Sequence, residues 1–145
     1  MNMPTRHESF VAARSPLPHR KFCARLGIAR DLEPWVICVR RAMGRMLAIP
    51  PSAIQTDDTW RNLLPLHPCD WDDVGVVLSL EGLGVLFPSA QSEELPRFLP
   101  GRFFWKTWPA PATFGEWDAA VSNHLVGHGC RLTKRASKNA CGGPL

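Results

Sequence analysis

The sequence contains no apolar run long enough to cross a membrane and no pattern of a secretory signal. Of its 145 residues 45% are apolar, yet the longest apolar stretch, residues 75–87, is interrupted by Ser79, Glu81 and glycines. It falls short of the roughly 20 residues that a membrane-spanning helix requires. The first ten residues lack the apolar segment and cleavage site of an export signal. We therefore expect a cytoplasmic protein without a membrane span.

Paired cysteines are missing as well. The five cysteines are odd in number and include no Cys-x-x-Cys pair. This pattern argues against a disulfide scaffold and for reduced thiols inside a cell. Cys23 with His19, or Cys69 with His67, could suggest a thiol nucleophile. No motif surrounds either pair, so incidental cysteines are the simpler interpretation.

The sequence also lacks a concentrated basic face. Lys and Arg outnumber Asp and Glu by nine to three in residues 1–50 and by six to two in residues 101–145. In residues 51–100 the balance is reversed, with two basic and eight acidic residues. Nucleic-acid binders gather positive charge on one contact face, because phosphate neutralisation supplies most of their affinity. The alternation of sign therefore argues against a dedicated nucleic-acid binder.

The first third of the chain predicts a flexible arm followed by two helices. Residues 1–16 are polar and aperiodic, so we expect a flexible N-terminal arm. Residues 18–26 have the apolar spacing of a short helix, which Gly27 would end.

The second of these helices is predicted at residues 32–48. Its apolar side chains recur three and four residues apart, and Asp31 is placed to act as the N-cap. Arg41 and Arg45 fall on the opposite face, with Arg40 at its border.

A packed connection and an apolar helix are expected in the middle of the chain. Residues 51–68 form the connection, and a helix begins at Asp70, whose carboxylate can accept from free backbone N–H groups. The glycines predict that this helix unwinds near Gly82. Its expected inward face consists of Trp71, Val74, Val77 and Leu78.

The last third predicts an extended loop, one helix and a tail. Residues 88–112 are rich in proline and aromatic side chains, which excludes a long helix there. Thr113 and Glu116 form a capping box that begins the last helix. After Val126 the pattern ends, so residues 127–145 are expected to be a disordered basic tail.

These elements together predict an all-α domain over residues 17–126. We expect a three- to four-helix bundle with the extended aromatic and proline-rich loop lying over it. The expected core is led by Val39, Met43, Trp71, Val74, Val77, Trp117 and Val121.

The order of motifs over residues 47–125 resembles an acyl carrier protein. The family's first helix ends in a motif like Leu47-Ala48-Ile49, and an Asp-rich turn like Asp57-Asp58-Thr59-Trp60 follows. Cys69-Asp70-Trp71-Asp72 aligns with the family's Asp-Ser-Leu-Asp at the start of the second helix. Leu80-Glu81, Phe87-Pro88 and Thr113-Phe114 match its later motifs. The resemblance implies an acyl-carrier-like helical bundle.

One departure changes the function that this resemblance implies. Asp70 occupies the position of the serine that carries phosphopantetheine in the family, and a carboxylate cannot form that phosphodiester. Ser79 lies too far along the helix to substitute for it. We therefore expect no cofactor, no enzymatic activity and a degenerate carrier that acts as a protein-interaction module. The alternative is a functional acyl or peptidyl carrier in biosynthesis, with phosphopantetheine attached.

Two groups of side chains are candidate sites. Asp70, Asp72 and Asp73 could form an acidic docking face for a protein partner with a basic surface, as the second helix does in the family. The simpler interpretation is helix capping and favourable interaction with the helix dipole. A zinc site is the second alternative. Its ligands would be His124, His128, Cys130 and Cys141.

Overall fold

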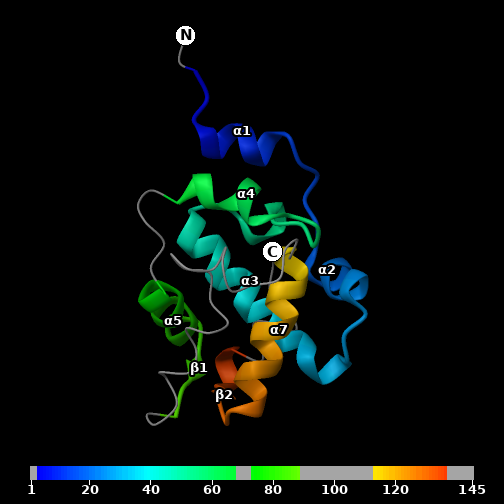
Figure 1. Ribbon diagram of the computed structural model, residues 1–145, viewed down its shortest axis with the longest axis vertical. Coiled ribbons are helices and arrows are strands. Elements are labelled where there is room, and N and C mark those ends of the chain that lie inside the picture. The colour runs from blue at the N-terminus through cyan, green and yellow to red at the C-terminus, as the bar shows by residue number, and fades with distance from the viewer. Residues whose placement is uncertain (1–2, 68–72, 89–112, 137–145) are drawn as a thin grey trace.

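The structure, a computed structural model, describes residues 3–67, 73–88 and 113–136. For residues 73–75 it describes the backbone and not the side chains. It is mostly helical, as the all-α prediction requires, but it also contains a small two-stranded sheet that was not predicted (Figure 1). The elements in chain order are α1 Arg6–Ala12, α2 His19–Leu26, η1 Arg30–Leu32, α3 Glu33–Leu47, η2 Pro51–Ala53, α4 Trp60–Leu63, η3 Leu64–Leu66, α5 Asp73–Gly82, β1 Val85–Leu86, α7 Phe114–Gly127 and β2 Arg131–Leu132.

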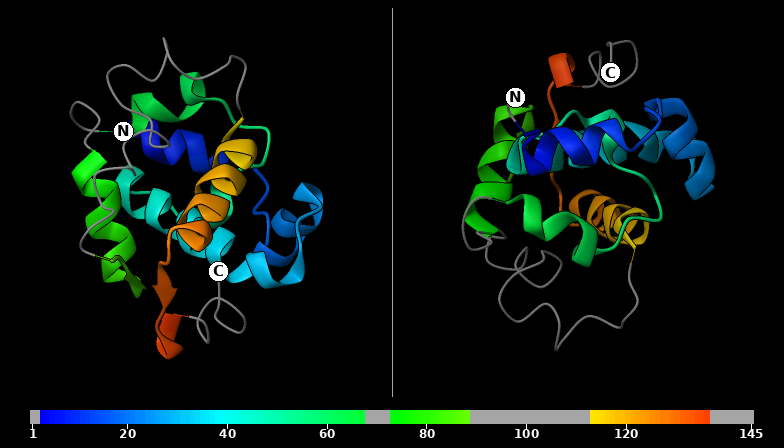
Figure 2. Two further views of the ribbon diagram at one scale, coloured as in Figure 1. Left: turned by 60° about the horizontal axis from the view of Figure 1, so that its bottom comes forward. Right: turned by 90° about the horizontal axis from the view of Figure 1, so that it is seen from above.

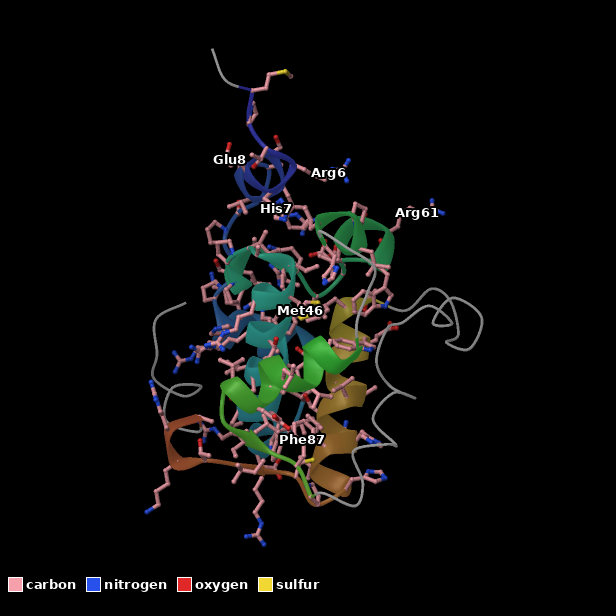
Figure 3. All side chains as sticks on the ribbon, turned by 90° about the vertical axis from the view of Figure 1, so that its left-hand side faces the viewer. Arg6, His7, Glu8, Met46, Arg61 and Phe87 are labelled. Atoms are coloured by element: carbon pink, nitrogen blue, oxygen red, sulfur yellow. The ribbon has the colours of Figure 1, made fainter. Side chains whose placement is uncertain are left out.

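A helix forms inside the segment that was expected to be a flexible arm. The Thr5 side chain accepts from the Glu8 backbone, and the Glu8 side chain accepts from the Thr5 backbone. This reciprocal pair satisfies free N–H groups at the start of α1. His7 lies on the side of α1 that faces the rest of the fold (Figure 3), and its Nε2 is 2.8 Å from the Leu66 carbonyl oxygen. The polar composition concealed a capped and docked helix.

Helix α3 is the centre of the fold and contacts α2, α5 and α7. It runs in the direction opposite to α5 and α7, which descend on either side of it (Figures 1 and 2). The prediction of Asp31 as its N-cap was wrong. Asp31 lies within η1, and Leu32 occupies the N-cap without a side-chain hydrogen bond. The 3₁₀ turn leads directly into α3 and replaces the expected cap.

Helix α5 presents a different face to the core from the one predicted. Val76 and Leu80 are buried, Val77 is half-buried, and Leu78 is 60% exposed. Trp71 lies outside the described residues, and the side chain of Val74 is not described. Four of the five residues from 76 to 80 are apolar, so the helical wheel defines no unique face and docking on α3 decides which side is buried. The predicted end at Gly82 was correct.

Helix α7 was predicted accurately at both ends. Thr113 and Glu116 form the expected capping box, and the helix ends at Gly127. Trp117, Val121 and Leu125 are fully buried. The ring of Trp117 meets that of Trp60 edge-on, with 5.0 Å between centroids. This contact ties the last helix to the connection before α5.

The small sheet orders part of the segment that was expected to be a disordered tail. Val85 pairs with Leu132 and Leu86 with Arg131 in an antiparallel register. Ala136 is buried beyond the sheet. Strands of two residues are too short to produce a periodic pattern in the sequence. Residues 137–145 lie outside the described part of the chain.

Candidate functional site

The predicted docking face falls at the edge of the described structure. Asp70 and Asp72 lie outside the described residues. Asp73 is the first residue of α5, and its side chain is not described. The proposed phosphopantetheine-equivalent position, Asp70, is therefore located by sequence alone.

The two histidines proposed as zinc ligands do lie together. The rings of His124 and His128 have centroids 3.9 Å apart and an interplanar angle of 30°. Nδ1 of His128 is 2.9 Å from the His124 carbonyl oxygen, which assigns the ring proton of His128 to Nδ1. Cys130 is buried, and burial raises the pKa of its thiol.

The third and fourth ligands of the zinc proposal are not assembled in the described structure. Among residues 3–67, 73–88 and 113–136, no group of three or more His, Cys, Asp or Glu side chains is arranged to hold a metal ion. Cys141 lies outside these residues. The rings of His124 and His128 are in contact at the end of α7.

A polar cluster inside the core was missed by the sequence interpretation. Arg40, expected at the border of the polar face of α3, is fully buried. Its Nη2 donates to the carbonyl oxygens of Leu17 at 2.9 Å and of Ile54 at 2.6 Å. Its guanidinium also lies 4.2 Å from the ring centroid of Phe22. Arg40 therefore joins the segment before α2, the connection after α3 and α3 itself.

His19 completes this cluster from α2. Its Nδ1 lies 3.1 Å from Nη1 of Arg40. Since Arg40 can only donate, His19 accepts through Nδ1 and is neutral, with its proton on Nε2. Burial, together with the charges of Arg40 and Arg41, lowers the pKa of His19 to about 4.

Two thiols near this cluster, Cys23 of α2 and Cys38 of α3, are also buried. Burial raises the pKa of the Cys23 thiol to about 12 and that of Cys38 to about 11. With pKa values this high, both side chains are protonated thiols at neutral pH. Nδ1 of His19, the other member of the first proposed pair, is occupied by the hydrogen bond from Arg40. Cys69, of the other proposed pair, lies outside the described residues.

Asp118 is a buried carboxyl group whose pKa is influenced by the charge of Arg40. It is fully buried in α7, and its Oδ1 accepts from the Ser122 hydroxyl at 3.2 Å. Burial raises its pKa well above the ordinary value, although the Ser122 hydrogen bond and the Arg40 charge act in the opposite direction.

A sequence signal for Arg40 did exist. Val36, Arg40, Met43 and Leu47 are spaced by four, three and four residues, which is the spacing of a buried helical stripe. An arginine in such a stripe must be buried with partners for its N–H groups. The position of Arg40 in this stripe therefore predicts its burial better than its polar character does.

Another long-range polar contact fixes the N-terminal segment. Nη1 of Arg14 donates to Oδ2 of Asp58 at 2.6 Å, and the same carboxylate oxygen accepts from the Gln55 backbone at 2.7 Å. The Arg14 guanidinium also lies 3.8 Å from the Phe10 ring centroid. The Asp-rich turn of the connection thus binds the segment after α1.

Comparisons with known proteins provide no further assignment. No family model, curated protein or solved structure matches this chain. Within the described residues, none of the helices combines the length and apolar character that crossing a bilayer needs.

Proposed function

We propose that the chain is a non-enzymatic, acyl-carrier-like interaction module that carries no phosphopantetheine. The observation that supports this proposal is the arrangement of the three longer helices. Helix α3 runs opposite to α5 and α7 and contacts both (Figure 1). A long connection, folded as η2, α4 and η3, joins α3 to α5. This order of parts is the one that the sequence resemblance implies.

The missing hydroxyl defines the expected chemistry. Asp70 stands three residues before the first residue of α5, where the resemblance places the modified serine. A carboxylate cannot form the phosphodiester of a prosthetic arm. Ser79, a hydroxyl within α5, is half-buried and lies in the second half of the helix. The domain would therefore keep the carrier shape without the carrier reaction.

The proposed role of the acidic residues is recognition of a protein partner. Asp70, Asp72 and Asp73 concentrate three carboxylates within four positions. Complementary charge accelerates association and selects partners with a basic surface. A cytoplasmic location fits this proposal, since the described cysteines Cys23, Cys38 and Cys130 are all buried free thiols.

A mass measurement tests the proposal. The protein is co-expressed with a broad-specificity phosphopantetheinyl transferase, and its intact mass is determined. The wild type is expected to gain no mass, whereas Asp70→Ser restores the hydroxyl and is expected to gain one phosphopantetheine. Asp57→Ser is the matched control, because Asp57 is an exposed carboxylate on the connection. It is expected to gain nothing.

The other outcomes contradict the proposal in different ways. A mass gain on the wild type would establish the alternative, a functional carrier, and its loss in Ser79→Ala would identify the modified residue. An Asp70→Ser variant that folds but stays unmodified would remove the support for a carrier-like shape.

A further inference from the structure

An arginine-lined hollow lies where α3, the end of α5 and the small sheet meet. It has a volume of about 260 Å³ and is lined by Arg41 and Arg45 of α3, by residues 81–84, and by Thr133 and Arg135. We call it the arginine hollow. Figure 3 shows the segment that contains β2 running beside β1 below α5. This pairing brings Thr133 and Arg135 to the hollow.

The arginine hollow has an excess of positive charge. Its lining includes three arginines and one acidic residue, Glu81. The ion pair found among the described residues joins Arg14 to Asp58, so no described carboxylate lies within 4.0 Å of these three guanidinium groups. The C-terminal ends of α3 and α5 each contribute a partial negative charge of about half a unit. The three arginines outweigh these contributions and leave the hollow positive.

Two glycines lie at close approaches within the arginine hollow. A Cβ on Gly82 would lie 3.2 Å from Nη1 of Arg45, so the guanidinium of Arg45 extends over the last turn of α5. Gly84 has a φ of +104°, and a Cβ there would lie 2.5 Å from Oγ1 of Thr133. Only glycine permits this approach between the end of α5 and the turn that carries Arg135.

Hydrogen bonds fix the turn that carries Arg135. The Thr133 backbone N–H donates to the Gly84 carbonyl oxygen at 2.9 Å. Oγ1 of Thr133 accepts from the Ala136 N–H at 3.1 Å, which leaves its hydroxyl proton to be donated elsewhere. The β1–β2 pairing therefore holds Arg135 and the Thr133 hydroxyl at the rim of the hollow.

A second hollow adjoins the first across the same two arginines. It has a volume of about 500 Å³ and is lined by Arg41 and Arg45 together with Gly44, Ala48, Ile49, Pro50 and Pro51. Apart from the arginines, these residues offer apolar side chains and backbone. The pair of hollows thus joins a cationic site to a larger and less polar one.

We propose that the two hollows bind a phosphorylated small molecule, with its phosphate in the arginine hollow and its remaining part in the adjoining one. Guanidinium groups match the geometry of phosphate oxygens and bind them through paired hydrogen bonds. The combined space is in the range of small-molecule sites, about 300–1,000 Å³. Three arginines in a concave site neutralise about one phosphate group, whereas nucleic acid requires a row of cations along a surface. This inference does not depend on the carrier proposal.

Amide chemical shifts of the ¹⁵N-labelled wild-type protein test the location. Inorganic phosphate at low salt is expected to shift the amide signals of Gly82, Gly84 and Thr133 to saturation. Adenosine 5′-monophosphate is expected to shift these signals and also those of Gly44 and Ile49, and to bind more tightly. Sodium chloride at equal ionic strength is expected to leave them unchanged.

Three results in these titrations would overturn the proposal. Equal shifts with chloride would reduce the effect to general screening. If adenosine 5′-monophosphate shifted only the amides that inorganic phosphate also shifts, the second hollow would take no part in binding. Tighter binding of a short DNA duplex through the same residues would replace the small molecule with a nucleic acid.

Arginine variants test the chemistry by calorimetry with the same two ligands. Arg45→Gln and Arg135→Gln are each expected to weaken phosphate binding about tenfold, because each removes a charged donor. Lys134→Gln is the matched control, since Lys134 is an exposed cation next to Arg135 that does not line the hollow. It is expected to bind as the wild type does. Unchanged affinity in both arginine variants, with circular dichroism showing a native fold, would contradict the assignment.

Discussion

Arg40 and His19 form a hydrogen bond in the core, with 3.1 Å between Nη1 of Arg40 and Nδ1 of His19. Arg40 is fully buried and His19 is 8% exposed. Because the second terminal nitrogen, Nη2, donates to the Leu17 and Ile54 carbonyl oxygens, one side chain connects three separate parts of the chain. The stability of the domain should therefore depend on this cluster.

Removal of the Arg40 guanidinium is expected to destabilise the fold strongly. Arg40→Met keeps an apolar chain of similar length but leaves the Leu17 and Ile54 carbonyl groups without their donor. Each unsatisfied buried group costs about 1–3 kcal/mol, so the free energy of unfolding should fall by about 2–5 kcal/mol in urea denaturation. Arg40→Lys should recover only part of this loss, because one ammonium group cannot replace the planar guanidinium.

Arg41→Met provides the control for this comparison. Arg41 is the next residue on α3 and is half-buried at the surface. A surface substitution of this kind changes stability by less than about 0.5 kcal/mol. If Arg40→Met were as stable as Arg41→Met, the buried hydrogen bonds would contribute nothing to the fold.

The neutral state of His19 predicts a loss of stability in mild acid. Its folded pKa is lowered to about 4 from an ordinary value of 6.5. Between these two values the unfolded chain binds a proton that the folded chain does not, so stability falls as the pH decreases from 6.5 toward 4. The full effect is at most about 3 kcal/mol. Urea midpoints measured from pH 7 to pH 4.5 should follow this fall.

Substitution of His19 by asparagine isolates the contribution of this residue. Asparagine offers an amide oxygen near the position of Nδ1 and does not titrate. The slope of stability against pH between 4.5 and 6.5 should decrease by about one proton in His19→Asn. An unchanged slope would assign the acid sensitivity to other groups.

Asp118 predicts the opposite dependence on pH. Burial raises its pKa well above the ordinary value, so the folded protein retains a proton that the unfolded chain releases near pH 4. Stability therefore decreases as the pH rises from about 4 toward the folded pKa. Asp118→Asn removes this titration and should raise the free energy of unfolding at pH 7 more than at pH 5. A marked destabilisation at pH 7 would mean that Asp118 is ionised and paired with Arg40.

The sequence predicted local features better than tertiary ones. Thr113 with Glu116 could be recognised as a capping pair because the relevant atoms lie within one turn of helix. The orientation of α5 could not be predicted, because Leu78 and Leu80 are equally apolar and contact with α3 decides which of them is buried. The arginine hollow was missed for a related reason. Arg45 and Arg135 are 90 positions apart, and only the β1–β2 pairing brings them to one site.

Gly115 is expected to be essential for the contact between α7 and the connection. A Cβ at this position would lie 2.7 Å from Cδ2 of Leu26 and 2.8 Å from the Thr56 carbonyl oxygen, to which the Gly115 N–H donates at 2.9 Å. The backbone oxygen cannot move aside without loss of this hydrogen bond. Gly115→Ala should therefore lower the free energy of unfolding by about 1–3 kcal/mol, despite the better helix propensity of alanine.

Gly127→Ala, at the other end of the same helix, is the matched control because nothing lies within 4 Å of its Cβ position. It should leave stability unchanged or raise it by up to about 1 kcal/mol. If urea denaturation gave Gly115→Ala and Gly127→Ala the same free energy of unfolding, the close approach of α7 to Thr56 would be contradicted.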